Sequence, residues 1–146
     1  MQILTKPIEI LLVEDNEGDV GLIEEVLEEG KIRNRLHIVD DGVEAMLFLH
    51  REGKYSGSPC PGMILLDLNL PKKDGREVLR EIKEDKNLWS IPVIVLTTSN
   101  DENDILRAYE LHVNAYTTKP LDFDQFTRTV DCIVNFWLKT AVLPTE

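Results

Sequence analysis

The sequence predicts an α/β protein: a doubly wound, five-stranded parallel sheet with strand order 2-1-3-4-5. Short runs of Ile, Val and Leu on consecutive positions alternate five times with longer amphipathic stretches. Such runs are typical of strands that are buried on both faces, and strict alternation of strand and helix gives a parallel sheet with right-handed crossovers. Five strands form this kind of sheet most compactly in the order given.

The predicted strands are five apolar runs of four to six residues, of which the last is the weakest. They lie at residues 8–13, 36–39, 63–66, 92–96 and 113–116. The longest connection between them, residues 53–62, contains Pro59 and Pro61, so we expect a surface loop there.

Apolar residues recur at the helical period between and after these runs, and they mark one face on each of five helices. The faces comprise Val20, Ile23, Val26 and Leu27; Ala45, Met46 and Leu49; Val78, Leu79 and Ile82; Ile105, Leu106 and Tyr109; and Phe123, Phe126, Val130, Ile133, Val134 and Trp137. Acidic and amide residues at the starts of four helices are candidate N-caps. They are Asp19, Asp40 or Asp41, Asp74, and Asn100 or Asp101.

Length and composition indicate one globular domain, residues 1–146, with a core at about 7–130 and a C-terminal helix and tail at 131–146. The formal charge of −11 repels nucleic acid phosphates and anionic lipid heads, so we expect neither nucleic acid nor membrane as a partner. We find no signal peptide and no apolar stretch of about 20 residues, which predicts a cytoplasmic protein. Cys60 and Cys132 are expected to be free thiols.

Polar side chains gather where the predicted strands end. Glu14 and Asp15 follow the first strand, Asp67 the third, Thr97 the fourth and Lys119 the fifth. In open α/β sheets, sites form beyond the carboxyl ends of the strands. Since the first, third and fourth strands are predicted neighbours, these side chains are expected to meet.

The three carboxylates would repel one another unless a cation joined them. Mg²⁺ takes carboxylate, water and phosphate oxygens. Glu14, Asp15 and Asp67, with the backbone carbonyl of Asn69, therefore predict a magnesium site in which Mn²⁺ would substitute. Asp67 would then be a nucleophile that forms an acyl phosphate.

Each of these residues also has an ordinary structural interpretation. Glu14 and Asp15 could begin a turn and cap the next helix, and a lone acid such as Asp67 after a strand is often a turn residue. Lys119 alone would be a surface lysine and Thr97 a common strand residue. Their convergence favours a functional interpretation, in which Lys119 supplies charge and Thr97 a hydrogen bond to phosphoryl oxygens.

Four segments, LLVEDNEGD, LLDLNLPKKDG, PVIVLTTS and NAYTTKPLD, occur in this order along the chain. In order and separation they resemble the signature segments of bacterial response-regulator receiver domains, over nearly the whole chain. The resemblance implies the flavodoxin-like receiver fold and a single-domain response regulator with no output domain. Such a protein accepts a phosphoryl group from a histidine kinase and signals through a conformational switch. It catalyses its own Mg²⁺-dependent phosphorylation and slow dephosphorylation but acts mainly as a switch.

The resemblance also assigns roles to individual residues. Asp67 matches the phosphoacceptor, Glu14 and Asp15 the acidic metal pair, and Asn69 the residue whose backbone carbonyl binds the metal. Thr97 matches the switch hydroxyl, Lys119 the phosphate-contacting lysine, and Tyr116 the aromatic rotamer switch, although a plain core tyrosine would be as ordinary there.

Three further positions bear on the same resemblance. Gly75 matches the glycine of the loop after the acceptor strand, and the Lys119–Pro120 peptide bond matches one that is usually cis. The family commonly has a very small residue after the switch hydroxyl, where this chain has Thr98. A branched side chain there is expected to narrow access to Asp67 and to slow donor entry or hydrolysis.

A narrower resemblance rests on PKKDGREVL, YELHVNAY and NFWLKTAVLP, which are similar to stand-alone regulators paired with cyanobacterial and bacterial phytochromes. It implies that the phosphodonor is a histidine kinase linked to a light sensor. It also implies a homodimer formed through the fourth helix, fifth strand and fifth helix. The output would then require an unidentified downstream protein or the dimer itself.

The C-terminal sequence points to the same kind of interface. Phe136, Trp137 and Leu138 are consecutive, so on a helix they cannot all face one core. With Val142 and Leu143 they predict an exposed apolar patch, of the kind that usually marks an interface. The alternative is that the tail folds back over its own domain.

Three other functions fit parts of the pattern. A binding module that works without phosphorylation would need neither the acids nor Lys119. A phosphohydrolase with an aspartyl nucleophile typically has a second acid two residues later, where this chain has Asn69. An FMN carrier would need a phosphate-binding loop where Glu14 and Asp15 would repel anions.

Overall fold

Five parallel strands form one central sheet in the order β2-β1-β3-β4-β5, which confirms the predicted topology. The strands are β1 (Ile8–Val13), β2 (Asn34–Val39), β3 (Met63–Leu66), β4 (Val93–Thr97) and β5 (Ala115–Thr118). The structure is a computed structural model, and it describes residues 6–144.

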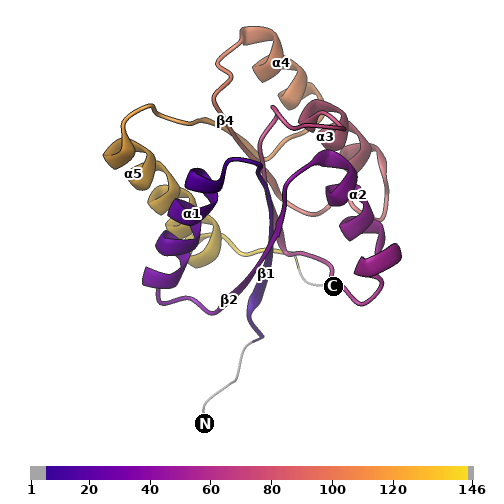
Figure 1. The fold of residues 1–146 in the computed structure, drawn as a ribbon, viewed down its shortest axis with the longest axis horizontal. Helices are drawn as coiled ribbons and strands as arrows, with labels where there is room; N and C mark the ends of the chain where they lie inside the picture. The colour runs from indigo at the N-terminus through magenta and orange to yellow at the C-terminus, as the bar shows by residue number, and fades with distance from the viewer. Residues whose placement is uncertain (1–5, 145–146) are drawn as a thin grey trace.

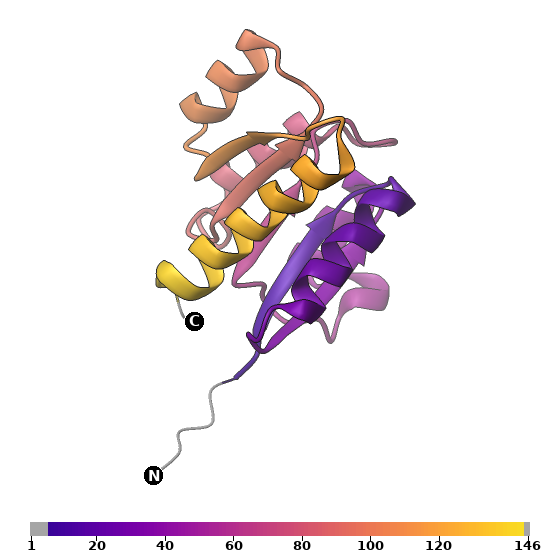
Figure 2. The same cartoon turned by 90° about the vertical axis from the view of Figure 1, so that its left-hand side faces the viewer.

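Helices cover both faces of the sheet (Figures 1 and 2). On one face lie α1 (Glu17–Glu29) and α5 (Phe123–Val134), and on the other lie α2 (Gly42–His50), α3 (Gly75–Glu84) and α4 (Glu102–Glu110). A 3₁₀ helix, η1 (Gly53–Tyr55), lies in the predicted loop, and a π-helical segment, η2 (Asn135–Thr140), extends α5. Among residues 6–144, no helix is both long and apolar enough to cross a membrane.

The strands are buried on both faces, which explains their continuous apolar runs. In β1, Leu11 and Val13 belong to the core beneath α2, α3 and α4, whereas Ile10 and Leu12 belong to the core beneath α1 and α5. All four side chains are at most 2% exposed. Because neither face of the central strands meets water, each predicted run lacks the polar alternation of a half-exposed strand.

The fifth strand begins two residues later than predicted. Val113 is buried, but its N–H donates to the carbonyl of Ala108 and so closes the C-terminal turn of α4. Pairing with β4 begins only at Ala115, opposite Ile94. The apolar character of Val113 therefore reflects helix-end packing, not strand pairing.

The predicted helix caps are confirmed in part. Asp41 and Asp101 accept hydrogen bonds from backbone N–H groups in the first turns of α2 and α4. Asp74 stands at the N-cap position of α3, but its carboxylate makes no capping hydrogen bond. The cap predicted for the first helix is wrong, because α1 begins earlier: Asn16 is its N-cap and accepts from the N–H of Asp19 at 3.0 Å.

Gly75 allows the start of α3 to lie directly against the end of β3. A Cβ atom at this position would stand 2.2 Å from the carbonyl oxygen of Asp67. No side chain tolerates such an approach, so the glycine is required for the loop after Asp67 to close onto the strand.

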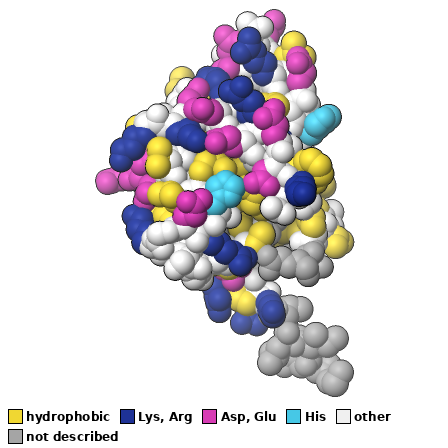
Figure 3. Space-filling model, turned by 90° about the vertical axis from the view of Figure 1, so that its right-hand side faces the viewer, with side chains coloured by type: hydrophobic (Ala, Val, Ile, Leu, Met, Phe, Trp, Pro, Cys, Tyr) yellow, Lys and Arg dark blue, Asp and Glu magenta, His cyan; other side chains and the backbone are white. Residues whose placement is uncertain are grey.

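Charged side chains of both signs are interspersed over the face of the molecule drawn in Figure 3. On the face in Figure 3, basic and acidic groups alternate without forming a continuous basic stripe. The whole sequence carries 27 acidic and 16 basic residues.

Candidate functional site

Backbone hydrogen bonds fix the residues that follow three of the strands. The N–H of Glu14 donates to the last carbonyl of β2 at 3.0 Å, and that of Asp67 donates to the last carbonyl of β1 at 3.1 Å. The N–H of Lys119 donates to the last carbonyl of β4 at 2.7 Å. Each bond extends the sheet ladder by one residue, so these side chains start from a rigid backbone.

The Lys119–Pro120 peptide bond is trans, which contradicts the cis bond implied by the family resemblance. Cis and trans X–Pro bonds differ by only about 0.5–1 kcal/mol, so sequence similarity alone could not fix the isomer. The trans bond does not prevent the Lys119 side chain from reaching the acids described next.

Lys119 is surrounded by three carboxylates. Its Nζ atom lies 2.6 Å from Oε1 of Glu14, 2.8 Å from Oδ2 of Asp19 and 3.0 Å from Oδ2 of Asp67. An ammonium group has three N–H donors, so these three acids use its full capacity. The side chains of Lys119, Glu14 and Asp67 are at most 7% exposed. Sequence reasoning missed Asp19 as a member of this site.

Burial and ion pairing act in opposite directions on the pKa values here. Burial raises the pKa of Glu14, and the hydrogen bond from Lys119 offsets only part of the rise. Burial lowers the pKa of the Lys119 ammonium, but its hydrogen bonds with Asp19 and Glu14 outweigh this effect and hold the pKa above the ordinary value. Lys119 is therefore a permanent positive charge in the site.

Glu14, Asp15 and Asp67 form a cluster that could hold a metal ion. One carboxylate oxygen from each lies within 4.8 Å of the other two. Glu14 and Asp67 are buried whereas Asp15 is exposed, so the cluster reaches from the sheet edge to solvent. Oxygen donors alone, with room for water on one side, fit a hard divalent cation.

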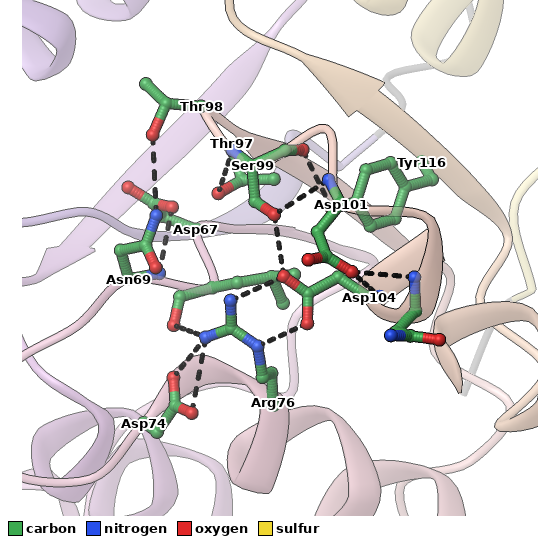
Figure 4. Close-up of polar contacts among 12 residues, drawn as sticks. Asp67, Asn69, Asp74, Arg76, Thr97, Thr98, Ser99, Asp101, Asp104 and Tyr116 are labelled. Carbon is green, nitrogen blue, oxygen red and sulfur yellow. Dashed lines mark hydrogen bonds and ion pairs between the residues drawn. The ribbon is translucent and has the colours of Figure 1, made fainter. Parts of the chain in front are cut away.

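Two donors hold the carboxylate of Asp67. The backbone N–H of Asn69 donates to Oδ1 at 3.1 Å, and Lys119 donates to Oδ2. The Asn69 amide also lies 3.4 Å from Oγ1 of Thr98, so these two side chains lie beside Asp67 (Figure 4). This fixed orientation suits a carboxylate nucleophile. The predicted contact between the Asn69 carbonyl and a metal stays a prediction.

Thr97 and Tyr116, the two predicted switch residues, meet at Ser99. Thr97 is fully buried, and its Oγ1 lies 3.4 Å from the N–H of Ser99. The Tyr116 hydroxyl donates to the carbonyl of Ser99 at 2.9 Å, and its ring is partly buried against the core beneath α2, α3 and α4 (Figure 4). Burial raises the pKa of the Tyr116 hydroxyl.

A second polar network, which sequence reasoning missed, joins α3 to α4 beside the switch residues. Arg76 binds both oxygens of Asp104, at 2.7 and 2.6 Å, and also binds Asp74 at 3.0 Å (Figure 4). The Ser99 hydroxyl donates to Asp104 at 2.6 Å. Arg76 and Asp104 are 28 positions apart, so no local spacing could have revealed the pair.

The three C-terminal residues predicted to form an interface differ in burial. Phe136 is 52% exposed, whereas Leu138 is 8% exposed and lies in the core beneath α1 and α5. Trp137 and Leu143 are partly buried against the same core, and Val142 is 96% exposed. The tail thus folds back in part over its own domain and leaves Phe136 and Val142 exposed.

A buried lysine, a buried hydroxyl and a cluster of acids thus lie together at the carboxyl edge of a 2-1-3-4-5 sheet. Residues 10–131 match the model of the response regulator receiver domain, and the chain belongs to this family.

Among curated proteins, the chain is 53% identical over 135 residues to response regulator Rcp1 of Synechocystis sp. strain PCC 6803, covering 92% of each protein. It is also similar to two solved structures. The Mn²⁺-bound form of Rcp1 matches with a TM-score of 0.94 and 52% identity, covering 95% of this chain and 100% of that one. The phosphorylated cyanobacterial phytochrome response regulator RcpA matches with a TM-score of 0.93 and 51% identity, covering 96% and 100%.

Proposed function

We propose that Asp67 is the phosphoacceptor of this response regulator and that a sensor histidine kinase is the donor. A carboxylate oxygen of Asp67 attacks the phosphorus of the kinase phosphohistidine. The P–N bond breaks, the imidazole leaves with the bonding electron pair and takes up a proton, and an acyl phosphate forms on Asp67. The observation that carries this proposal is the buried Asp67 carboxylate, which is held by the Asn69 N–H and by Lys119.

Two other residues are proposed to contact the phosphoryl oxygens. Lys119 already lies 3.0 Å from Asp67, so its ammonium is placed to stabilise the charge that the phosphoryl group brings. Thr97 ends the neighbouring strand β4, and its hydroxyl would donate to another oxygen. Lys119 acts through its charge and Thr97 through a hydrogen bond, and neither residue takes part in a covalent step.

We assign the acid cluster to Mg²⁺, for which Mn²⁺ would substitute. Glu14, Asp15 and Asp67, with the backbone carbonyl of Asn69, would hold the ion. Bound there, it would offset the repulsion between the attacking carboxylate and the incoming phosphoryl group.

Signalling would follow from movement of Thr97 toward the phosphoryl group. Ser99 contacts both Thr97 and Tyr116, so a shift of Thr97 changes the position of the tyrosine. The surface formed by α4 and β5 would change with it. This is a local charge event that biases a two-state element.

The phytochrome-type kinase is the donor class that we favour. RcpA is a cyanobacterial phytochrome response regulator, and a bacteriophytochrome response regulator, RtBRR, is 42% identical to this chain with a TM-score of 0.75, covering 96% of this chain and 84% of that one. The recipient of the signal is proposed to be a downstream protein or the homodimer.

We further propose a homodimer formed through α4, β5, α5 and the C-terminal tail. The exposed apolar side chains on these elements include Leu106 and Tyr109 of α4, Phe123 of α5 and Phe136 of η2, each at least 50% exposed. Apolar groups spread over adjoining elements are typical of an interaction surface.

The test of the phosphoacceptor uses acetyl phosphate, with and without Mg²⁺, and intact mass as the readout. The wild type and a control variant, Asp40→Asn, are expected to gain one phosphoryl group only with Mg²⁺. Asp40 is an exposed acid outside the site. Asp67→Asn is expected to gain none, because an amide is not a nucleophile toward phosphorus. Phosphorylation of Asp67→Asn to the wild-type level would refute the assignment.

A further inference from the structure

We propose that Asp19 is a positioning residue that holds Lys119 in place while the other two acids serve the metal ion. This inference rests on the proposed phosphorylation function. The Asp19 carboxylate lies 2.8 Å from the lysine Nζ and is 22% exposed, so it borders the site from the side of α1. The contact spans 100 positions of the chain.

Asp19 has no competing role in its own helix. An acid at the third position of a helix commonly reaches back to the N–H of the N-cap residue. Here the N–H of the N-cap, Asn16, instead donates to Oε2 of Glu14 at 3.2 Å. The side-chain oxygen of Asn16 accepts from the backbone N–H of Asp19, whereas the Asp19 carboxylate pairs with Lys119.

Asp19 also differs from the other two partners of the lysine. Glu14 and Asp67 share the acid cluster with Asp15, and Asp19 does not belong to it. A divalent cation and the Lys119 ammonium therefore compete for Glu14 and Asp67, whereas Asp19 serves the lysine alone. If Glu14 and Asp67 turned to the cation, two of the three N–H groups of Lys119 would be freed for phosphoryl oxygens, and Asp19 would keep the third.

Removal of the Asp19 charge has two consequences. Lys119 would pair more strongly with Glu14 and Asp67 and so would oppose cation binding. The ammonium would also lose the one partner that fixes it once the cation is bound, which would slow phosphoryl transfer. Both effects require the contact with Lys119, and not merely an acid in this helix.

The first arm of the test measures Mn²⁺ binding by electron paramagnetic resonance of the free ion. Asp19→Asn is expected to bind Mn²⁺ about three- to tenfold more weakly than the wild type, because one nearby charge is lost and the lysine is redirected. Glu17→Gln is the matched control. It also removes one acid from the first turn of α1, but Glu17 is exposed and makes no contact with Lys119.

The second arm measures the maximal rate of phosphorylation by acetyl phosphate at saturating Mg²⁺. Asp19→Asn is expected to lower this rate, and Glu17→Gln to leave it unchanged. Circular dichroism confirms that both variants fold; if Asp19→Asn does not fold, Asp19→Glu, which retains the charge, should bind Mn²⁺ like the wild type. Equal Mn²⁺ affinities for Asp19→Asn and Glu17→Gln would overturn the proposal. A wild type that gains no phosphoryl group would refute the proposed function, and the Mn²⁺ arm would still decide the role of Asp19.

Discussion

At the residue scale, Ser99 connects the two residues to which the switch is assigned. Its N–H lies near the hydroxyl of Thr97, its own hydroxyl donates to Asp104, and its carbonyl accepts from Tyr116. Each polar group of this residue thus has a different partner, on β4, α4 and β5. A displacement of Thr97 would be passed to Tyr116 through one residue, without a chain of intermediate contacts.

The size of the Thr98 side chain affects access to the carboxylate of Asp67. Its exposed side chain lies beside Asn69, next to the Asp67 carboxylate (Figure 4). Thr98→Ala is expected to shorten the lifetime of the acyl phosphate about two- to fivefold, because water reaches the phosphorus more easily. The lifetime is measured by loss of the phosphoryl mass after removal of the donor. Thr129→Ala, on α5, is the control, and a lifetime that is unchanged or longer in Thr98→Ala would contradict the prediction.

At the scale of elements, the Arg76–Asp104 pair ties α3 to α4 and makes stability depend on pH. The hydrogen bonds from Arg76 lower the pKa of Asp104 from 3.8 to about 2. The stabilisation is therefore complete above about pH 4 and is lost as the pH falls toward 2. The lowered pKa of Asp104 corresponds to at most about 2 kcal/mol of stabilisation, and solvent screening of Arg76, which is 39% exposed, reduces this to about 1 kcal/mol.

Urea unfolding at a series of pH values tests this dependence. The free energy of unfolding of Asp104→Asn is expected to lie about 1 kcal/mol below that of the wild type at pH 6, and the gap should narrow as the pH falls to about 3. Asp124→Asn, which alters an acid in the first turn of α5, should show no such narrowing. A gap that stays constant with pH would mean that the ion pair does not stabilise the fold.

The elements that the sequence predicts best are those whose pattern is local. Periods of apolar residues were sufficient to find five helices and five strands in the described chain, although the fifth strand was predicted two residues too early, and strand ends located Glu14, Asp67 and Lys119. One error came from a contact between distant segments, and another came from a local pattern that two kinds of element share. Asp19 looked like a cap, because nothing in its neighbourhood reveals that Lys119 will lie beside it. Val113 looked like a strand residue, because burial at a helix end and burial in a sheet favour the same side chain.

At the scale of the whole molecule, net charge and exposed apolar surface act against each other in self-association. Two copies with a formal charge of −11 each repel, so a dimer requires favourable contacts that outweigh this term. The exposed apolar groups of α4, α5 and η2 are the candidates, since Leu138 and most of Trp137 are already used within the chain. Added salt should therefore favour the dimer, because it screens the repulsion and leaves apolar contacts intact.

Phe136 is the sharpest probe of this interface, because it is half exposed and its removal leaves the core beneath α1 and α5 intact. The wild type is expected to be a dimer by light scattering. Phe136→Glu is expected to be a folded monomer, because in a symmetric dimer each copy would bury one unpaired carboxylate in the interface. Trp89→Glu is the matched control: its ring is 55% exposed, but it lies between α3 and β4, outside the proposed surface. It should leave the dimer unchanged. A dimer that survives Phe136→Glu would place the contact elsewhere on the molecule, and a monomeric wild type at every concentration and salt would leave signalling to a partner protein alone.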